Sequence, residues 1–389
     1  MKKNAWGAML LALLLLFTIV ACDEDTVDGS DETNGSSTGA VVDGGSESVS
    51  DTDENTSPIL CEKHTFGDWE TVLQATCGAN GKRERICEVC GHTETGAIPM
   101  QGEHIYMDTG KCKICSKAMD KDFLFTLNDD GISYSFNYDG NASSVTVPST
   151  YNELPVTKLS EYAFWWCNEL KTVKLPDSIV EIGAYAFDSC PSLTSVNTPE
   201  SLSVIGKGAF SGCSSLTSFR IPEAVTRIEY YTFANCGLKS VNLPKTLTYV
   251  GEDAFTGCCE FTTLTIPASV MEIGEGAFSA CRALKEIRIE DGTRLTHISE
   301  NAFSSGASLK SVVIAEGITH LDDNAFFSNL RLNSVTLPST VVSIGDMAFY
   351  NSADTLTVNY NGTPEEWALI EFGDKWTSGN VTVNVVYKQ

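Results

Sequence analysis

Cysteines and histidines between residues 58 and 118 have the types and spacing to bind metal ions. Two Cys-x-x-Cys pairs lie in this segment. Each can hold one ion from a single tight turn and leaves two coordination positions for other side chains. Eight candidate ligands would complete two tetrahedral sites: Cys61, His64, Cys77, Cys87, Cys90, His104, Cys112 and Cys115. The pattern predicts two structural zinc ions.

A disulfide framework is the alternative for the same module, because its six cysteines are even in number and an extracytoplasmic chain oxidises readily. Either way the role is structural, since no spare ligand position is evident for a catalytic metal. The runs His-Thr-Phe-Gly-Asp-Trp and Arg-Ile-Cys-Glu-Val-Cys-Gly resemble zinc-ribbon-like modules of secreted gut-bacterial proteins.

The first 21 residues have the composition of a signal peptide. Two lysines precede an apolar run over residues 8–20, which suits a signal-peptide core better than a membrane-spanning helix. The run ends in Ile-Val-Ala-Cys, which resembles a bacterial lipobox, and this resemblance implies lipidation of Cys22. A plain signal peptide with an incidental cysteine is the alternative. We therefore expect an extracytoplasmic lipoprotein, anchored to the membrane at the cell surface through its lipid only.

Residues 22–57 contain no lysine or arginine and few apolar side chains. Such a segment cannot bury enough apolar surface to offset its chain entropy, so we expect a disordered acidic tether. The whole chain has a formal net charge of −25. Nucleic acid is excluded as a partner, because its binding needs clusters of lysine and arginine.

The remainder of the chain is dominated by a repeat. A phenylalanine recurs every 23 residues, except for one interval of 22 and one of 25, at Phe164, Phe187, Phe210, Phe233, Phe255, Phe278, Phe303, Phe326 and Phe349. Each repeat also contains Leu-x-x-Val-x-Leu or a close variant. In the first, Val173 and Leu175 are expected to face inward, and Thr172 and Lys174 outward, as in a short strand.

A period of this length predicts a β-rich leucine-rich-repeat solenoid, here a rod of about nine 23-residue repeats over residues 161–360. No unit can bury its own apolar side, so the units must stack and both ends need caps. We expect the N-terminal cap and a first partial repeat over residues 119–160. The C-terminal cap is expected over residues 361–389, with a short helix that Thr363 caps.

The consensus Ala-Phe-x-x-Cys-x-x-Leu-x-x-Val-x-Leu-Pro-x-x-Val-x-x-Ile-Gly resembles the BspA-type (treponemal) leucine-rich repeats of bacterial surface proteins. The resemblance covers more than half of the chain. It implies a surface protein of adhesion or recognition type and does not name a ligand.

The outward strand positions form rows of short polar side chains with a few cations. Extended faces of this kind are what solenoids use for binding, although short polar residues also suit any solvated strand. The predicted ligand-binding face consists of Thr172, Lys174, Ser195, Asn197, Ser218, Arg220, Ser240, Asn242, Thr263, Thr265, Glu286 and Arg288. Its cations would attract an anionic ligand, because distant charges of an acidic protein are screened.

These features predict a non-enzymatic surface lipoprotein whose rod binds a host or neighbouring-cell surface protein, or a polysaccharide. The alternative is a structural or glycan-binding envelope protein in which the repeats are a spacer. Catalysis is not expected, because His297 and His320 are the only histidines in the repeats and no nucleophile motif lies near them. These two lie one repeat apart, at outward positions, where stacking would form a small column.

Overall fold

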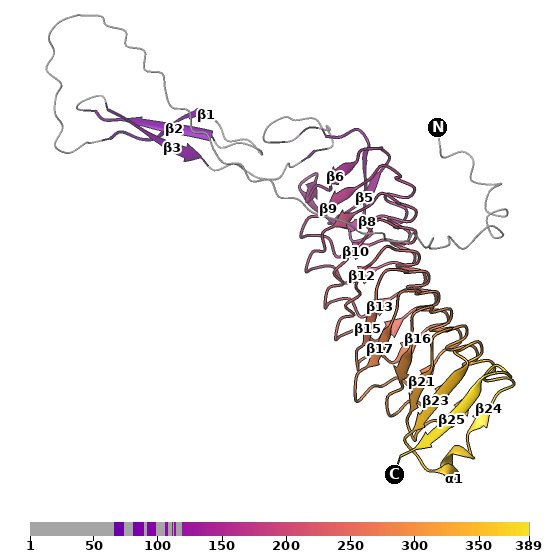
Figure 1. The fold of residues 1–389 in the computed structure, drawn as a ribbon. Coiled ribbons are helices and arrows are strands. Elements are labelled where there is room, and N and C mark those ends of the chain that lie inside the picture. The colour runs from indigo at the N-terminus through magenta and orange to yellow at the C-terminus, as the bar shows by residue number, and fades with distance from the viewer. Residues whose placement is uncertain are drawn as a thin grey trace, which may run out of the picture. The chain divides into compact units, whose positions relative to one another are not determined.

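The computed structural model describes residues 66–73, 81–88, 92–98, 106–107, 111, 113 and 119–388. From residue 119 onward the chain winds into a β-solenoid of about 11 turns with a repeat of about 23 residues and almost no helix (Figure 1). This arrangement confirms the predicted fold class. Among the described residues, no helix is long and apolar enough to cross a membrane.

A small antiparallel sheet precedes the solenoid in the sequence. It consists of β1 (Glu70–Leu73), β2 (Gly81–Ile86) and β3 (Thr93–Ile98), with β2 in the middle. The guanidinium of Arg85 lies 4.6 Å from the ring centres of both Phe66 and Trp69. Aromatic–arginine contacts of this type contribute modestly to stability at exposed sites.

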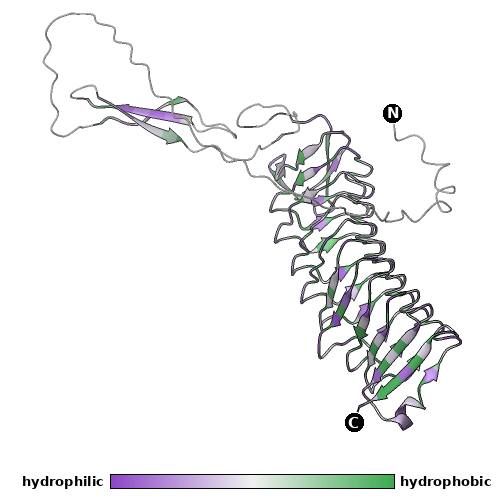
Figure 2. Cartoon of the chain, in the orientation of Figure 1, coloured by the Kyte–Doolittle hydropathy of each residue, from purple (hydrophilic) through white to green (hydrophobic). Residues whose placement is uncertain are grey.

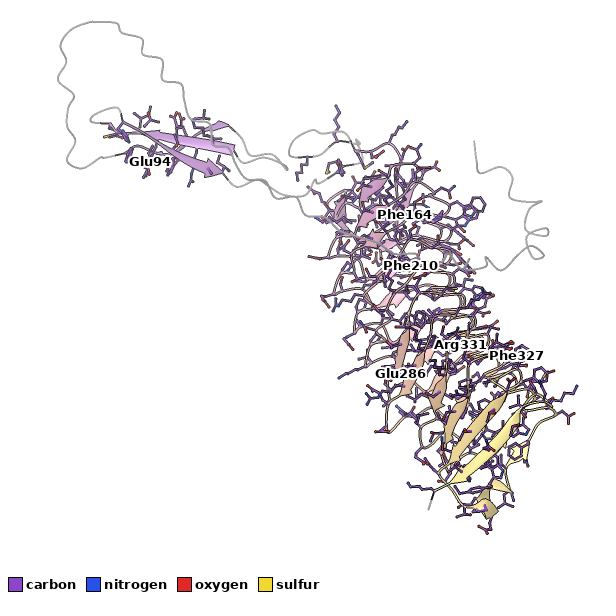
Figure 3. All side chains as sticks on the ribbon, viewed as in Figure 1. Glu94, Phe164, Phe210, Glu286, Phe327 and Arg331 are labelled. Carbon is purple, nitrogen blue, oxygen red and sulfur yellow. The ribbon has the colours of Figure 1, made fainter. Side chains whose placement is uncertain are left out.

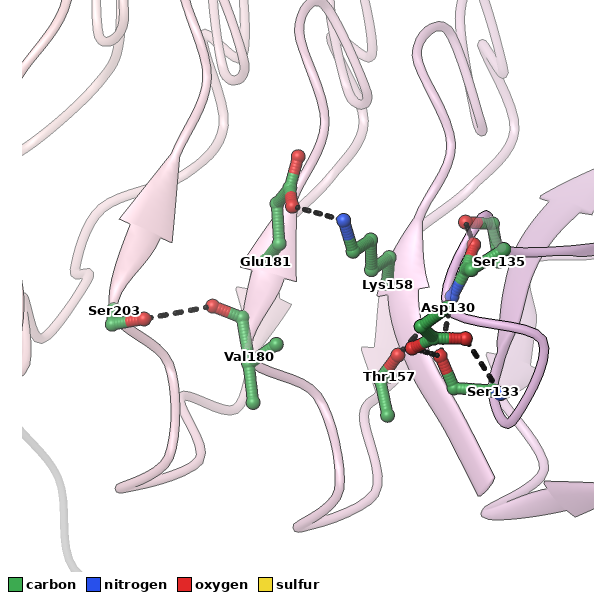
Figure 4. A network of polar contacts seen from close by, with 9 residues as sticks. Asp130, Ser133, Ser135, Thr157, Lys158, Val180, Glu181 and Ser203 are labelled. Atoms are coloured by element: carbon green, nitrogen blue, oxygen red, sulfur yellow. Dashed lines mark hydrogen bonds and ion pairs between the residues drawn. The ribbon is translucent and has the colours of Figure 1, made fainter. Parts of the chain in front are cut away.

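The N-terminal cap begins with β4 (Phe123–Leu127) and β5 (Tyr134–Tyr138), which form an antiparallel hairpin around an Asp-Gly turn. Asp130 closes this turn. Its carboxylate accepts hydrogen bonds from the backbone N–H groups of Ile132 (2.9 Å) and Ser133 (3.0 Å) and from the Ser133 hydroxyl (2.6 Å; Figure 4). The hydrogen bond from the Ser133 hydroxyl is the main reason why the pKa of Asp130 lies below its usual value.

The cap joins the first turns of the solenoid through β8 (Leu154–Leu159), which runs parallel to β5, while β7 (Thr150–Tyr151) pairs with β8 in an antiparallel hairpin. An ion pair between Lys158 and Glu181, 2.9 Å long, then links β8 to the next strand of the same sheet (Figure 4). The sheet of the cap therefore continues directly into the strands of the first turns.

One side of the solenoid carries a row of parallel strands whose outward surface we call the strand face. They are β6 (Ser144–Thr146), β9 (Thr172–Lys174), β11 (Ser195–Val196), β15 (Thr263–Ile266), β17 (Glu286–Ile289), β19 (Ser311–Val313), β21 (Ser334–Leu337), β23 (Thr355–Tyr360) and β25 (Thr382–Tyr387). Apolar and polar residues alternate along them, most visibly in β21, β23 and β25 (Figure 2). The apolar residues face the core, as the sequence period of two requires.

A second row of shorter strands continues from β8. It comprises β10 (Glu181–Ile182), β12 (Val204–Ile205), β13 (Arg227–Ile228), β14 (Tyr249–Val250), β16 (Glu272–Ile273), β18 (His297–Ile298), β20 (His320–Leu321), β22 (Ser343–Ile344) and β24 (Glu371–Phe372). Each contributes one buried aliphatic side chain to the core, except β24, where both residues are exposed. In every turn up to β22, the second strand therefore closes the core opposite the strand face.

The turns that carry the repeated phenylalanines form a third side, which we call the turn edge. Consecutive phenylalanine rings stack with centres 4.9 to 5.5 Å apart along the whole column from Phe164 to Phe349. Backbone hydrogen bonds accompany the rings, as from Phe187 N to Ala209 O at 2.7 Å, and recur in each turn. Figure 3 shows Phe164 and Phe210 inside the solenoid.

Five of the six cysteines that follow these phenylalanines are buried and structural, and Cys167 is half-buried. The thiol of Cys213 donates a hydrogen bond to the carbonyl of Phe187 (3.1 Å), and four other cysteines repeat this contact one turn further along. Burial raises the pKa of Cys190 and of Cys258 to about 12. These thiols therefore stay protonated. They serve as hydrogen-bond donors to backbone carbonyl groups that lie outside the strands.

The C-terminal cap contains α1 (Pro364–Trp367), where Thr363 caps the helix as expected and forms a capping box with Glu366. Trp367 lies edge-on to Tyr360 with ring centres 5.3 Å apart. Trp376 lies edge-on to Phe349, the last ring of the column, at 6.3 Å. The two tryptophans thus pack over the last repeat.

Candidate functional site

The twelve residues of the predicted ligand-binding face all lie exposed on the strand face. They belong to β9, β11, β15 and β17, to Asn197 directly after β11, and to two segments between β11 and β15, residues 218–221 and 240–243. The period-two alternation therefore located the outward side chains correctly. Their role in binding remains a prediction.

The strand ladder is interrupted in the middle of this face. β11 pairs with β9 and β15 pairs with β17, but residues 218–221 and 240–243 between them form no strand. Within the described part of the chain, the backbone N–H and C=O groups of these two segments make no hydrogen bond to other protein groups. Backbone groups that lack a protein partner must be satisfied by water or by a ligand.

Two local departures from the repeat accompany the interruption. Phe219 occupies the inward strand position that Val196 and Val241 occupy in the neighbouring turns, and its ring packs on Phe210 (4.6 Å) and Phe233 (5.3 Å). The next repeat is also one residue shorter, at Gly237. A Cβ atom at Gly237 would lie 2.1 Å from the carbonyl oxygen of Ser214, so only glycine fits there.

A groove of about 540 Å³ occupies the interrupted part of the strand face. Phe219 and Leu243, both half-buried, supply apolar surface. Short polar side chains surround them, namely Ser195, Asn197, Ser218, Ser240 and Asn242. The groove combines an apolar floor, hydroxyl and amide groups, and unpaired backbone groups, which together can hold an extended segment of another molecule.

Arg220, one of the three cations predicted to attract an anionic ligand, is already paired. Its guanidinium forms two hydrogen bonds to the carboxylate of Glu200, at 2.7 and 3.1 Å. These bonds raise the pKa of Arg220 and lower that of Glu200. Lys174 and Arg288 form no ion pair with any described residue, so the uncompensated positive charge of the face lies on either side of the groove.

Asn197 also has a structural partner. Its side-chain amide accepts a hydrogen bond from Leu175 N (2.6 Å) and donates one to Leu175 O (2.9 Å). The side chain thereby replaces backbone pairing where β11 stops after two residues. Asn197 shapes one wall of the groove rather than offering a free amide to a ligand.

The two histidines of the repeats lie on the second row of strands. Their rings stack with centres 4.4 Å apart and planes 14° apart, as expected. The hydroxyls of Thr296 and Thr319 lie 2.9 and 2.7 Å from the Nδ1 atoms of His297 and His320, respectively. Among the described residues, no group of three side chains could hold a metal ion. The pair is therefore a surface feature without a third ligand.

The floor of the groove is what sequence reasoning missed. Phe219 and Leu243 align with Val173 and Leu175, the positions that the sequence predicts to face inward. The available signals were a phenylalanine where other repeats have an aliphatic residue and the single interval of 22 residues.

The structure leaves the predicted zinc sites untested. Cys87 follows β2 and is buried, and its N–H donates to the carbonyl of His92 at 2.8 Å across the turn between β2 and β3. The other seven predicted ligands, Cys61, His64, Cys77, Cys90, His104, Cys112 and Cys115, lie outside the described residues, as do Cys22, the signal peptide and the tether. Zinc, disulfides and the lipid anchor stay predictions.

Comparisons with known proteins agree with the fold. A family model, the BspA type Leucine rich repeat region (6 copies), matches residues 132–259 and 250–367, more than half of the chain. A solved leucine-rich repeat protein from Bacteroides ovatus is 21% identical, with 70% of this chain and 71% of that chain covered and a TM-score of 0.50. This likeness concerns the fold alone.

Two further solved structures are similar over much of their length. A leucine rich cell surface protein from Faecalibacterium prausnitzii is 24% identical, with 65% of this chain and 97% of that chain covered and a TM-score of 0.29. A leucine rich repeat protein from T. pallidum is 24% identical, with 62% and 85% covered and a TM-score of 0.34. A search of curated proteins gave no match.

Proposed function

The chain belongs to the BspA-type leucine-rich-repeat family, and from this premise we propose that its solenoid binds an extracellular protein through the strand face. The observation that carries the proposal is the groove between β11 and β15. It is the place on the strand face where apolar surface, short polar side chains and unpaired backbone groups occur together.

The chemistry of the groove favours a polypeptide ligand. An extended peptide has alternating N–H and C=O groups, which match the unpaired backbone groups of residues 218–221 and 240–243. One apolar side chain of the peptide would cover Phe219, and burial of such a side chain contributes about 1.5–3 kcal/mol. Lys174 and Arg288 would add longer-range attraction for an acidic partner.

The location of this activity rests on the predicted leader. A lipid on Cys22 and an acidic tether over residues 22–57 would hold the solenoid away from the membrane, with its strand face open to a host or neighbouring-cell protein. Zinc or disulfides in residues 58–118 would supply the cross-links that so small a module needs. In this proposal the module is structural, and the solenoid does not catalyse a reaction.

The test is binding of the full-length protein to immobilised fibronectin, laminin and type I collagen, measured by surface plasmon resonance. In the test variant, Ser218→Arg and Ser240→Arg together fill the groove with two exposed long side chains. The matched control is Ser311→Arg, an exposed outward position of β19 outside the groove. We expect the wild type and the control to bind equally and the double variant to bind about tenfold more weakly.

Thermal unfolding of the three proteins should coincide, because all the changed side chains are exposed. The proposal is wrong if none of the three matrix proteins binds the wild type, or if the double variant binds as well as the control.

A further inference from the structure

A cluster of aromatic side chains is exposed on the turn edge of the first repeats. Tyr162, Trp165 and Trp166 are 37%, 44% and 56% exposed, respectively, and Tyr185 joins them from the next turn. The rings of Tyr162 and Tyr185 stack with centres 5.3 Å apart and planes 7° apart. Trp165 lies 5.8 Å from Tyr162 and 5.7 Å from Trp166. We call these four residues the aromatic cluster.

The backbone of the aromatic cluster is unfavourable for such residues. Tyr162, Trp166 and Tyr185 have φ angles of 60°, 59° and 54°, in the left-handed region where a bulky side chain is an outlier. Most equivalent positions in later turns carry smaller side chains or none, such as Gly208, Gly212, Asn235, Gly257 and Gly276, although Tyr231 is aromatic again. A bulky aromatic ring kept at a strained position points to a function for the ring.

Neighbouring residues hold the rings in place. The indole N–H of Trp165 donates a hydrogen bond to the carboxylate of Asp188 at 2.9 Å. A Cβ atom at Gly208 would lie 2.3 Å from the ring of Tyr185, so this ring lies directly against the glycine of the next turn. These contacts restrict the side chains of Trp165 and Tyr185, which lowers the entropy lost there when a ligand binds.

We propose that the aromatic cluster is a binding site for a neutral polysaccharide. A pyranose ring presents C–H groups on its faces and hydroxyls around its rim. Exposed indole and phenol rings match the faces, while the phenol hydroxyls and the exposed carboxylate of Glu161 match the rim. A polyanionic glycan is disfavoured, since the chain has a formal net charge of −25.

This inference goes beyond the proposed function, because the site and the ligand class both differ. The strand face and the turn edge are separate sides of the solenoid, as Glu286 and Phe327 show at opposite sides of Figure 3. A protein ligand in the groove and a sugar chain on the aromatic cluster can therefore be tested independently. A glycan-bound turn edge would leave the groove open.

The experiment is gel electrophoresis of the full-length protein through native gels that contain soluble xylan, glucomannan or mixed-linkage β-glucan, with polygalacturonate as the anionic comparison. The test variant combines Trp165→Ser and Trp166→Asn, the residue types that Ser211 and Asn235 place at the same positions of later turns. The control combines Phe327→Ser and Tyr350→Ser, a stacked aromatic pair further along the same edge.

We expect at least one neutral polysaccharide to retard the wild type and the control, and the test variant to need about tenfold more polysaccharide for the same retardation. Polygalacturonate should retard none of them. A Tyr185→Gly variant, which relieves backbone strain instead of adding any, should also bind more weakly and guards against misfolding as the cause.

The proposal is overturned if none of the neutral polysaccharides retards the wild type, or if the test variant is retarded like the control. It is also overturned if the wild type sediments as a dimer that the test variant turns into a monomer, because a second copy would then cover the aromatic cluster. Binding of matrix proteins by the groove would be unaffected by either result.

Discussion

The structure predicts that substitutions of Gly306 and Asn329 have coupled effects on the stability of the protein. Both stand where other repeats have a cysteine. The side-chain amide of Asn329 donates to Phe303 O (2.9 Å) and Phe326 O (2.8 Å), and its buried Oδ1 has no hydrogen-bond partner among the described residues. A Cβ atom at Gly306 would lie 2.5 Å from that oxygen. Glycine therefore makes room for the asparagine of the next turn.

The perturbation is Gly306→Cys, which restores the repeat consensus. Overpacking against Asn329 should destabilise the protein by about 1–3 kcal/mol. At about 2–4 °C per kcal/mol for a folded unit of this size, the melting temperature should fall by about 4–8 °C for a change near 2 kcal/mol. Asn329→Cys alone loses one hydrogen bond but also removes an unsatisfied buried oxygen, so we expect a change below about 1 kcal/mol.

The double variant should be close to the wild type in stability. With cysteine at both positions the contact is relieved, and the new thiol at position 306 can donate to Phe278 O, as Cys281 does to Phe255 O. The assay is differential scanning calorimetry of all four proteins in the presence of a reductant. We expect a coupling of about 1–3 kcal/mol between the two sites. Additive shifts would refute the reasoning.

Three further predictions concern stability. Burial raises the pKa of Cys258 from 9.0 to about 12. Between these two pH values the unfolded chain releases a proton that the folded chain retains. The contribution of Cys258 to the free energy of unfolding is therefore complete below pH 9 and is lost as the pH rises toward 12. Urea unfolding should show a shallower decline over this range for Cys258→Ala, and an unchanged slope would contradict the burial argument. Phe255→Ala should lower the free energy of unfolding by about 3–5 kcal/mol, because its ring stacks between two others; a loss below about 1 kcal/mol would mean that the column is not tightly packed. Thr363→Ala should lower it by about 1 kcal/mol through loss of the helix cap, and no change on urea unfolding would show that α1 does not contribute.

The sequence predicted the features that follow directly from the period of the repeat. A spacing of 23 residues brings equivalent side chains above one another, and so the phenylalanine column and the stack of His297 on His320 were both expected. The alternation of apolar and polar residues likewise placed Thr172 and Lys174 outward. These inferences needed only the period of the repeat and the alternation within each strand.

Features that depend on contacts between unlike repeats were not predictable. The groove results from the packing of Phe219 on Phe210 and Phe233, and the sequence does not show that this ring accompanies a loss of strand pairing. In the same way, the sequence does not show that the guanidinium of Arg220 is paired with the carboxylate of Glu200.

The left-handed turn positions were hidden for a different reason. Their residue types range from glycine to tyrosine, so no single residue type identifies them. At these positions the backbone conformation repeats while the residue type varies. The sequence shows only the residue type, so the repeated conformation cannot be inferred from it.

The most direct test of the account is amide hydrogen exchange of the full-length protein, alone and saturated with whichever of the three matrix proteins binds it. In the free protein, residues 218–221 and 240–243 should exchange faster than the paired strands β15 and β17. On binding, we predict that protection appears at residues 218–221 and 240–243. Protection confined to the second row of strands, or none at the groove, would contradict the central claim that the strand face binds through the groove.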